Sequence, residues 1–141
     1  MIWQYNIQKI VMVTGLYEHG KQKCYQYWPS EGSMEFGTIC VEIVDEDVCT
    51  EYTSRHLKFT QTASREHKMV TQFHFTAWLD RDVPNSPASL LQFLHKVRHT
   101  GDHNESPTLV HCRLSMHSFL ILFLPDVKNI YKLLPMWSSL V

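Results

Sequence analysis

The feature that most constrains this chain is a short apolar segment followed by a histidine and a cysteine. Thr108, Leu109 and Val110 form a run rich in β-branched residues that follows a polar turn, and such a run predicts a buried strand. His111 and Cys112 then lie at the carboxyl end of that strand. In open α/β sheets this edge is where ligands bind, so the sequence points to a site around His111 and Cys112.

The other segments predict a sheet around this strand. Continuous apolar residues favour a central strand covered on both faces, whereas the alternation of Phe73 and Phe75 with polar residues is typical of a half-buried strand. Asn85-Ser86-Pro87 predicts a helix start, followed by an apolar stripe up to about His99. The expected strands are 10–14, 38–44, 51–62, 67–77 and 108–110, with an acidic turn at 45–47. The predicted fold class is therefore α/β (α+β), a twisted mixed sheet with flanking helices.

Composition excludes several classes of function. The 141 residues suit one domain, and 13 Lys+Arg against 14 Asp+Glu give a net charge of −1, so no basic excess indicates nucleic acid. The longest apolar stretch, 119–124, is too short to cross a bilayer. Residues 1–4 do not have the pattern of a secretory leader. We expect no membrane span, no cofactor and a cytoplasmic setting.

The four cysteines form no Cys-x-x-Cys pair and show no spacing typical of metal sites. Cys24, Cys40 and Cys49 are interpreted as buried thiols, and the aromatic residues of 25–28 as core. A metal site built by His111, Cys112 and His117 would need a fourth ligand. We therefore expect no metal.

Several short motifs, in one order along residues 1–112, together resemble a receptor-type protein tyrosine phosphatase domain. The matching segments are Met1-Ile2-Trp3, residues 10–14, Lys23-Cys24-Tyr25-Gln26-Tyr27-Trp28-Pro29, Glu51-Tyr52-Thr53-Ser54-Arg55, residues 72–78 and Val110-His111-Cys112. The resemblance implies an incomplete form of the phosphatase fold. It also makes Arg55 part of a structural motif, and it ends directly after the His-Cys pair.

The resemblance implies roles for four residues. Cys112 matches the nucleophile, whose thiolate attacks the phosphorus of phosphotyrosine and forms a cysteinyl phosphate. Asp80 matches the general acid that protonates the leaving phenolate. His111 would support the thiolate. Trp78 would be the hinge of the acid loop beside the substrate.

The sequence departs from the family pattern around two of these residues. Leu79 stands where the family has proline, and Arg81-Asp82 stand where it has His-Gly. After Cys112 the family has a glycine-rich loop and, six positions on, an arginine that grips the phosphoryl group. Residues 113–118 here contain no glycine, and Ser118 replaces that arginine. We therefore expect an inactive or severely impaired phosphoric monoester hydrolase.

Two readings of function follow. The first is a fragment of a tyrosine phosphatase domain at 1–112 with an unrelated apolar tail at 113–141. The second is a pseudophosphatase-like binding or regulatory module. The implied partners are phosphotyrosine proteins and another receptor phosphatase domain, on the intracellular side of a membrane receptor. The family has further helices after the segment that matches Cys112, and residues 113–141 do not resemble them. One sheet face is therefore expected to be uncovered and prone to aggregation, unless the tail docks there as a substitute helix or strand.

Overall fold

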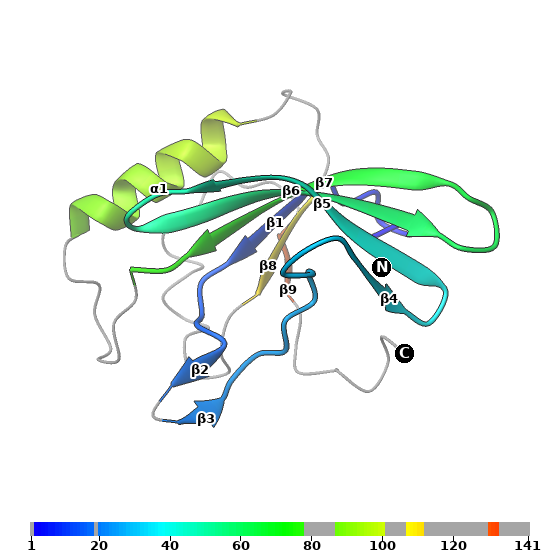
Figure 1. Ribbon diagram of the computed structural model, residues 1–141. Helices are drawn as coiled ribbons and strands as arrows, with labels where there is room; N and C mark the ends of the chain where they lie inside the picture. Colours follow the sequence, from blue (N-terminus) through cyan, green and yellow to red (C-terminus); the bar gives the residue numbers. More distant parts are fainter. Residues whose placement is uncertain (1, 19, 78–86, 101–106, 112–129, 133–141) are drawn as a thin grey trace.

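A seven-stranded mixed sheet forms the centre of the computed structural model, which describes residues 2–18, 20–77, 87–100, 107–111 and 130–132 (Figure 1). The strand order is β4-β5-β6-β7-β1-β8-β9, and a separate two-stranded hairpin pairs β2 with β3. The elements are β1 (Lys9–Met12), β2 (Tyr17–Glu18), β3 (Lys21–Gln22), β4 (Ser33–Phe36), β5 (Ile39–Val48), β6 (Tyr52–Gln61), β7 (His67–Phe75), α1 (Pro87–His99), β8 (Thr108–His111) and β9 (Ile130–Lys132).

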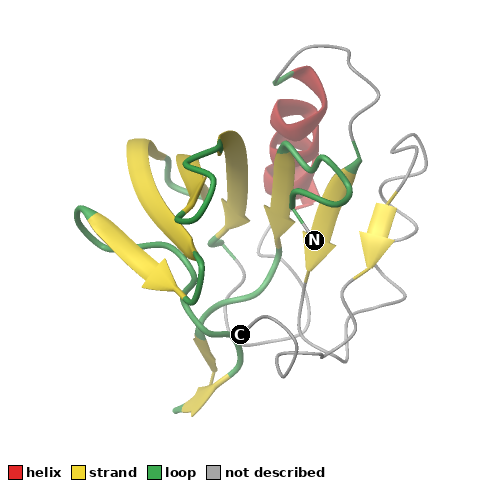
Figure 2. Cartoon of the chain, turned by 90° about the vertical axis from the view of Figure 1, so that its right-hand side faces the viewer, coloured by secondary structure: helices red, strands yellow, loops and turns green. Residues whose placement is uncertain are grey.

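The sheet has an antiparallel half and a parallel half. Strands β4 to β7 form an antiparallel meander, while β1 pairs in parallel with both β7 and β8. The described part therefore has the mixed sheet expected for an α/β protein, although it contains one helix where the sequence predicted several. Figure 2 shows the twist of the strands and the position of α1 on one side of them.

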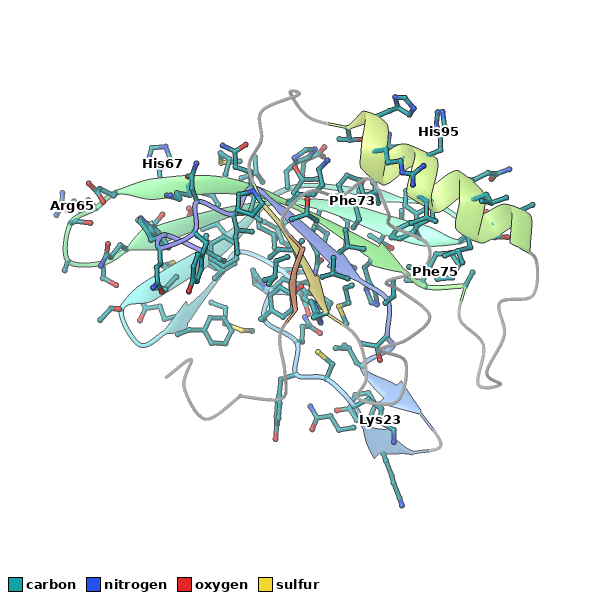
Figure 3. The ribbon with its side chains drawn as sticks, turned by 180° about the vertical axis from the view of Figure 1, so that it is seen from behind. Lys23, Arg65, His67, Phe73, Phe75 and His95 are labelled. Carbon is teal, nitrogen blue, oxygen red and sulfur yellow. The ribbon has the colours of Figure 1, made fainter. Side chains whose placement is uncertain are left out.

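Helix α1 covers one face of the sheet, as its apolar stripe predicts. The helix starts at Pro87, whose fixed φ and missing N–H suit the first turn. Its spacing of apolar residues places them on a single face. That face packs on the strands in a buried cluster of Val11, Val13, Phe73, Phe75, Leu90, Phe93, Leu94, Val97 and Val110. Figure 3 shows Phe73 and Phe75 between the strands and the helix.

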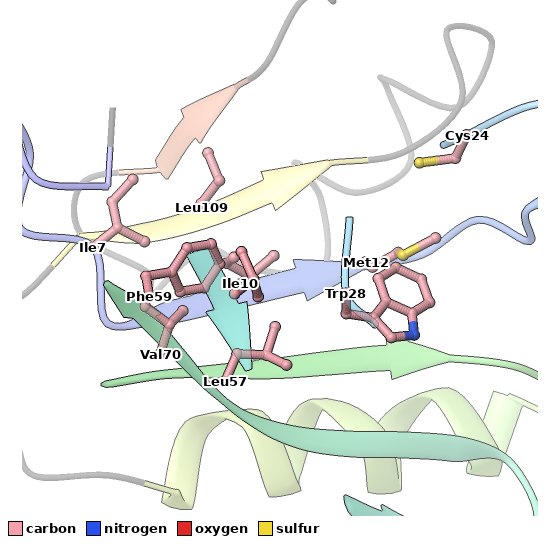
Figure 4. Close-up of a cluster of buried hydrophobic side chains, with 10 residues drawn as sticks. Ile7, Ile10, Met12, Cys24, Trp28, Leu57, Phe59, Val70 and Leu109 are labelled. Atoms are coloured by element: carbon pink, nitrogen blue, oxygen red, sulfur yellow. The ribbon is translucent and has the colours of Figure 1, made fainter. Parts of the chain in front are cut away.

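A second cluster fills the opposite face of the sheet (Figure 4). Its buried members are Ile7, Ile10, Met12, Cys24, Trp28, Val41, Leu57, Phe59, Val70 and Leu109. Each of them is at most 6% exposed. The described strands therefore do not present the uncovered apolar face that the sequence suggested.

The predicted acidic turn at 45–47 is instead part of a strand. Strand β5 continues to Val48, and its pairing with β6 shifts register between Ile43 and Asp45. Such a β-bulge lets a strand continue past an irregular residue. After the bulge Glu46 stands opposite Arg55, so the acidic residues pair with β6.

Strand β9 adds three residues of the predicted tail to the sheet. It pairs in parallel with β8, from Thr108 opposite Ile130 to Val110 opposite Lys132. These three residues extend the edge of the sheet beyond β8, whereas the alternative expectation was that the tail docks on a sheet face.

Candidate functional site

Of the four predicted site residues, the structure describes His111. This residue ends β8, where the sequence predicted it. Cys112, Asp80 and Trp78 lie outside the described residues. The described part of the site is therefore the surroundings of His111, which directly precedes the predicted nucleophile.

Three parallel strands end side by side at this point. Met12 of β1 is in register with His74 of β7 on one side and with His111 of β8 on the other. The amide of Val13 also donates a hydrogen bond of 3.2 Å to the carbonyl of His111. The carboxyl ends of β7, β1 and β8 thus form one edge, as expected for the ligand-binding edge of a parallel sheet.

Tyr27 holds the His111 imidazole. The Tyr27 hydroxyl lies 2.9 Å from Nε2 of His111, and the two rings meet edge to face at 5.5 Å. Nε2 of Gln72 donates to the same hydroxyl over 2.7 Å. Strand β1 lies between β7 and β8, and its residue at this level, Met12, carries no hydroxyl. The Tyr27 hydroxyl therefore links Gln72 of β7 to His111 of β8.

Arg55 on β6 continues this network away from the edge. Its Nη1 donates to Oε1 of Gln72 over 3.0 Å, and its Nε donates to Glu46 over 2.6 Å. The guanidinium also lies over the ring of Trp28, 4.7 Å from the centroid, which adds a cation–π attraction. Arg55 is thus fixed by an acid, an amide and an aromatic face.

His74 forms a branch of the same network. Its Nε2 donates to the carbonyl of Thr14 over 2.9 Å, and its Nδ1 lies 3.4 Å from Nη1 of Arg55. The His74 ring packs edge to face with Trp28 at 5.7 Å. The side chain therefore ties the end of β7 to the residues that follow β1.

Burial sets the charge of both imidazoles. Burial, with the nearby His74 acting in the same direction, lowers the pKa of His111 to about 4. Burial also lowers the pKa of His74, with Arg55 acting in the same direction and the Thr14 carbonyl opposing. Both rings are neutral near pH 7, so each has one N–H donor and one acceptor nitrogen.

The cysteines and aromatic residues that the sequence predicted to be buried differ in their exposure. Trp28 and Cys24 are buried, as predicted, and burial raises the pKa of the Cys24 thiol to about 11. Tyr25 is 60% exposed, and Cys40 and Cys49 are only partly buried, so these three predictions were wrong. They fail because each of these residues lies near an open edge or a loop.

The sequence indicated neither Gln72 nor Tyr27 as part of a site. Gln72 is fully buried and His74 is 7% exposed, whereas alternation with phenylalanine favoured a solvent-facing side for both. Residues 24–28 fold over that side. The sequence offered one indication, because Gln72 and His74 are two positions apart. Residues with this spacing lie on the same face of a strand, where they can contact the same polar side chain.

The described part of the chain contains neither a membrane-spanning helix nor a cluster of potential metal ligands. There, no helix is long and apolar enough to cross a membrane. The same residues contain no group of three or more potential metal ligands. Two of the three residues weighed as a metal site, Cys112 and His117, lie outside the described ranges.

Chemically, the described edge can orient a neutral imidazole firmly. Nε2 of His111 is occupied by the Tyr27 hydroxyl, and that hydroxyl is in turn fixed by Gln72. Such support is what a site residue needs to stay within productive geometry. The arrangement therefore holds the His111 imidazole in one orientation at the carboxyl end of β8.

Comparisons with known proteins agree with this architecture. The family model of the protein-tyrosine phosphatases matches residues 1–115. Receptor-type tyrosine-protein phosphatase alpha of Homo sapiens is 40% identical over 116 residues, which is 79% of this chain and 14% of that protein. The eta phosphatase of Gallus gallus is 42% identical over 114 residues, again 79% of this chain and 8% of the relative.

A third relative, receptor-type tyrosine-protein phosphatase zeta of Rattus norvegicus, is 38% identical over 120 residues, which is 79% of this chain and 5% of that protein. The chain thus spans a small part of the length of these relatives. The resemblance read from the sequence motifs is confirmed at the level of the family. On the strength of the family match and these identities, this chain belongs to the protein-tyrosine phosphatase family.

Proposed function

We propose that residues 1–112 are part of a tyrosine phosphatase catalytic domain whose family reaction is the dephosphorylation of phosphotyrosine. In that reaction the Cys112 thiolate attacks phosphorus and forms a cysteinyl phosphate, and Asp80 protonates the departing phenolate. Trp78 is the hinge of the acid loop. The observation that carries this proposal is the network that holds His111, the residue before Cys112, at the carboxyl edge of three strands.

In this chain we propose that turnover is lost or severely reduced, because of the residues that follow Cys112. The transferring phosphoryl group carries negative charge on three oxygens. Converging N–H donors and a bidentate arginine guanidinium are needed to stabilise this charge. Residues 113–118 lack glycine, and Ser118 cannot supply the guanidinium. Loss of one such donor costs about 3–4 kcal/mol of transition-state stabilisation, so losing several lowers turnover by many powers of ten.

The acid loop adds a second defect. Leu79 lacks the fixed φ that proline gives to a loop and to the residue before it. Asp82 lacks the tolerance of glycine for a positive φ. Both substitutions reduce the time that Asp80 spends in position to donate its proton, which makes leaving-group departure slower.

A binding or regulatory role is the second candidate. It is favoured by the intact network from Glu46 to His111, together with a sequence after Cys112 that has Ser118 in place of the family's arginine. Such a pseudophosphatase-like module would dock on phosphotyrosine proteins or on another receptor phosphatase domain, inside the cell. Immobilised chain should then retain a purified phosphatase domain, and should fail to do so after its own thermal unfolding.

Hydrolysis of p-nitrophenyl phosphate tests the catalytic proposal. We expect the folded chain and its Cys112→Ser variant to hydrolyse this ester at the same background rate. Turnover above about 1 s⁻¹ that disappears in Cys112→Ser would contradict the proposed defect. The Ser118→Arg variant is the matched comparison, and any gain in rate there must also depend on Cys112.

A further inference from the structure

We propose that Arg55 fixes the tautomer of His111 through a directed chain of hydrogen bonds, so that the imidazole carries its proton on Nδ1 and acts as a positioning donor rather than as a base. The chain runs from Arg55 through Gln72 and Tyr27 to His111. Its meaning for catalysis rests on the proposed function. The tautomer itself follows from the described contacts alone.

The direction of the chain is set at Arg55. A guanidinium has N–H donors and no acceptor, so the atom of Gln72 that faces Nη1 must be the amide oxygen. The distance between Nη1 and Oε1 is 3.0 Å. The amide is therefore locked in one orientation, with its NH₂ group turned toward Tyr27.

The next two links follow from that orientation. The NH₂ group of Gln72 donates to the Tyr27 hydroxyl oxygen over 2.7 Å. The hydroxyl proton is then free to point at Nε2 of His111, 2.9 Å away. A nitrogen that accepts this proton must have a free lone pair, so the proton of the neutral ring is on Nδ1.

His74 supplies an internal contrast. Its Nε2 faces a carbonyl oxygen, that of Thr14, over 2.9 Å. A carbonyl only accepts, so His74 carries its proton on Nε2. Its Nδ1 is then an acceptor facing Arg55 at 3.4 Å. Arg55 thus contacts His74 directly and is linked to His111 through Gln72 and Tyr27, and the two histidines are held in opposite tautomers.

This arrangement removes His111 as a proton acceptor for its neighbour at position 112. The Nε2 lone pair is occupied by the Tyr27 hydroxyl, and Nδ1 already carries a proton. The titratable groups near the ring among the described residues are His74, Tyr27 and, beside Tyr27, Cys24 and Arg55. Burial lowers the pKa of His74 and raises the pKa of Tyr27 and of Cys24, so these three side chains stay neutral around pH 7 and the contact at Nε2 is kept.

Nitrogen-15 NMR of the imidazole rings tests the proposal on the folded chain near pH 7. We expect His111 to show a protonated Nδ1 and an unprotonated Nε2, and His74 to show the reverse pattern. A protonated Nε2 at His111 in the unmodified chain would overturn the proposal. The readout does not require turnover, so it is separate from the test of phosphatase activity.

The Gln72→Glu variant makes the test directional. A carboxylate accepts from Arg55 and from the Tyr27 hydroxyl together, so that hydroxyl can no longer donate to His111. We expect Nε2 of His111 to become the protonated nitrogen, with its two nitrogen signals exchanging character completely. Retention of the Nδ1 proton in a folded Gln72→Glu chain would show that Arg55 and Gln72 do not set the tautomer.

Two further variants separate this effect from a general loss of structure. Tyr27→Phe removes the last donor, and we expect a mixture of both tautomers at His111 with His74 unchanged. Lys58→Met is the matched control, because Lys58 is on the same strand as Arg55 and pairs with Glu42 at 2.9 Å, away from the network. A changed His111 pattern in Lys58→Met would contradict a specific chain through Arg55.

Discussion

At the scale of single residues, His111 and His74 are polar groups kept neutral inside the protein. Burial lowers the pKa of each ring, because the charged form loses its hydration. The hydrogen bonds to Tyr27 and to Thr14 give Nε2 of His111 and Nε2 of His74 a protein partner in place of water. Stability should therefore depend on pH through these two side chains.

The pH dependence has a definite sign. An unfolded imidazole takes up a proton near pH 6.5, whereas folded His111 stays neutral down to about pH 4. As the pH falls through this window the unfolded state binds more protons, so the free energy of unfolding decreases, by roughly 3 kcal/mol at most. Urea titrations at several pH values should show a steeper loss in the unmodified chain than in His111→Asn. Equal slopes would contradict a lowered pKa.

Lys9 is a second residue with an unusual position. Its ammonium donates a 2.7 Å hydrogen bond to the carbonyl of Val97 in the last turn of α1, and burial lowers its pKa. The last carbonyls of a helix have no partner within the helix, and a cation there interacts favourably with the helix dipole. Lys9 therefore caps α1 from strand β1.

Replacing Lys9 with methionine should decrease the free energy of unfolding by about 1 kcal/mol, because the Val97 carbonyl loses its charged donor. Lys68→Met is the matched control. Lys68 donates to Asn6 at an exposed position, where a single hydrogen bond contributes little. Thermal or urea unfolding measures both changes, and a loss in Lys68→Met as large as in Lys9→Met would argue against the cap.

At the scale of elements, α1 is attached to the sheet by one face. Phe93 is fully buried and stacks at 5.1 Å against Phe75 and at 5.7 Å against Tyr52. Leu91, two positions away, is 59% exposed. The two residues therefore differ in burial within the same helix.

Truncating each side chain to alanine should separate packing from helix propensity. Phe93→Ala should destabilise the chain by about 3–5 kcal/mol, since it removes a buried ring and leaves a cavity. Leu91→Ala should change stability by less than about 0.5 kcal/mol. Comparable losses in both variants, measured by urea unfolding, would mean that α1 does not pack through Phe93.

The long elements were predictable because their apolar residues form either continuous runs or periodic patterns. Strands β1, β5, β6, β7 and β8 and helix α1 all appear where the sequence placed them, within a few residues at the ends. Strands β3 and β4 were missed because their side chains are mostly exposed, and β2 and β9 because they are two and three residues long. Segments this short, or with side chains this exposed, leave no apolar pattern in the sequence.

At the scale of the whole molecule, the site was only partly predictable. His111 was placed at its strand end by the apolar run before it. Its partners were not, because Gln72 and Tyr27 meet from segments 45 residues apart, and no local pattern encodes that approach. The family resemblance supplied the roles of Cys112 and Asp80, which local patterns could not provide.

The chain combines a folded framework that resembles its family with a segment after Cys112 that departs from the family pattern. The sheet, α1 and the polar network are those of a phosphatase framework, whereas residues 113–118 contain no glycine and have Ser118 where the family has arginine. We therefore propose, as the central claim, that Cys112 lacks an effective oxyanion cradle although the described framework up to His111 is folded. Binding of an oxyanion that imitates the transferring phosphoryl group therefore tests this claim directly.

Titration of the folded chain with orthovanadate, followed by amide and imidazole NMR signals, is the most direct measurement. The His111 ring signals report in the same sample that the framework is folded. We expect no saturable change that depends on Cys112. Saturable binding that shifts the amides of residues 113–118 and disappears in Cys112→Ser would contradict the claim.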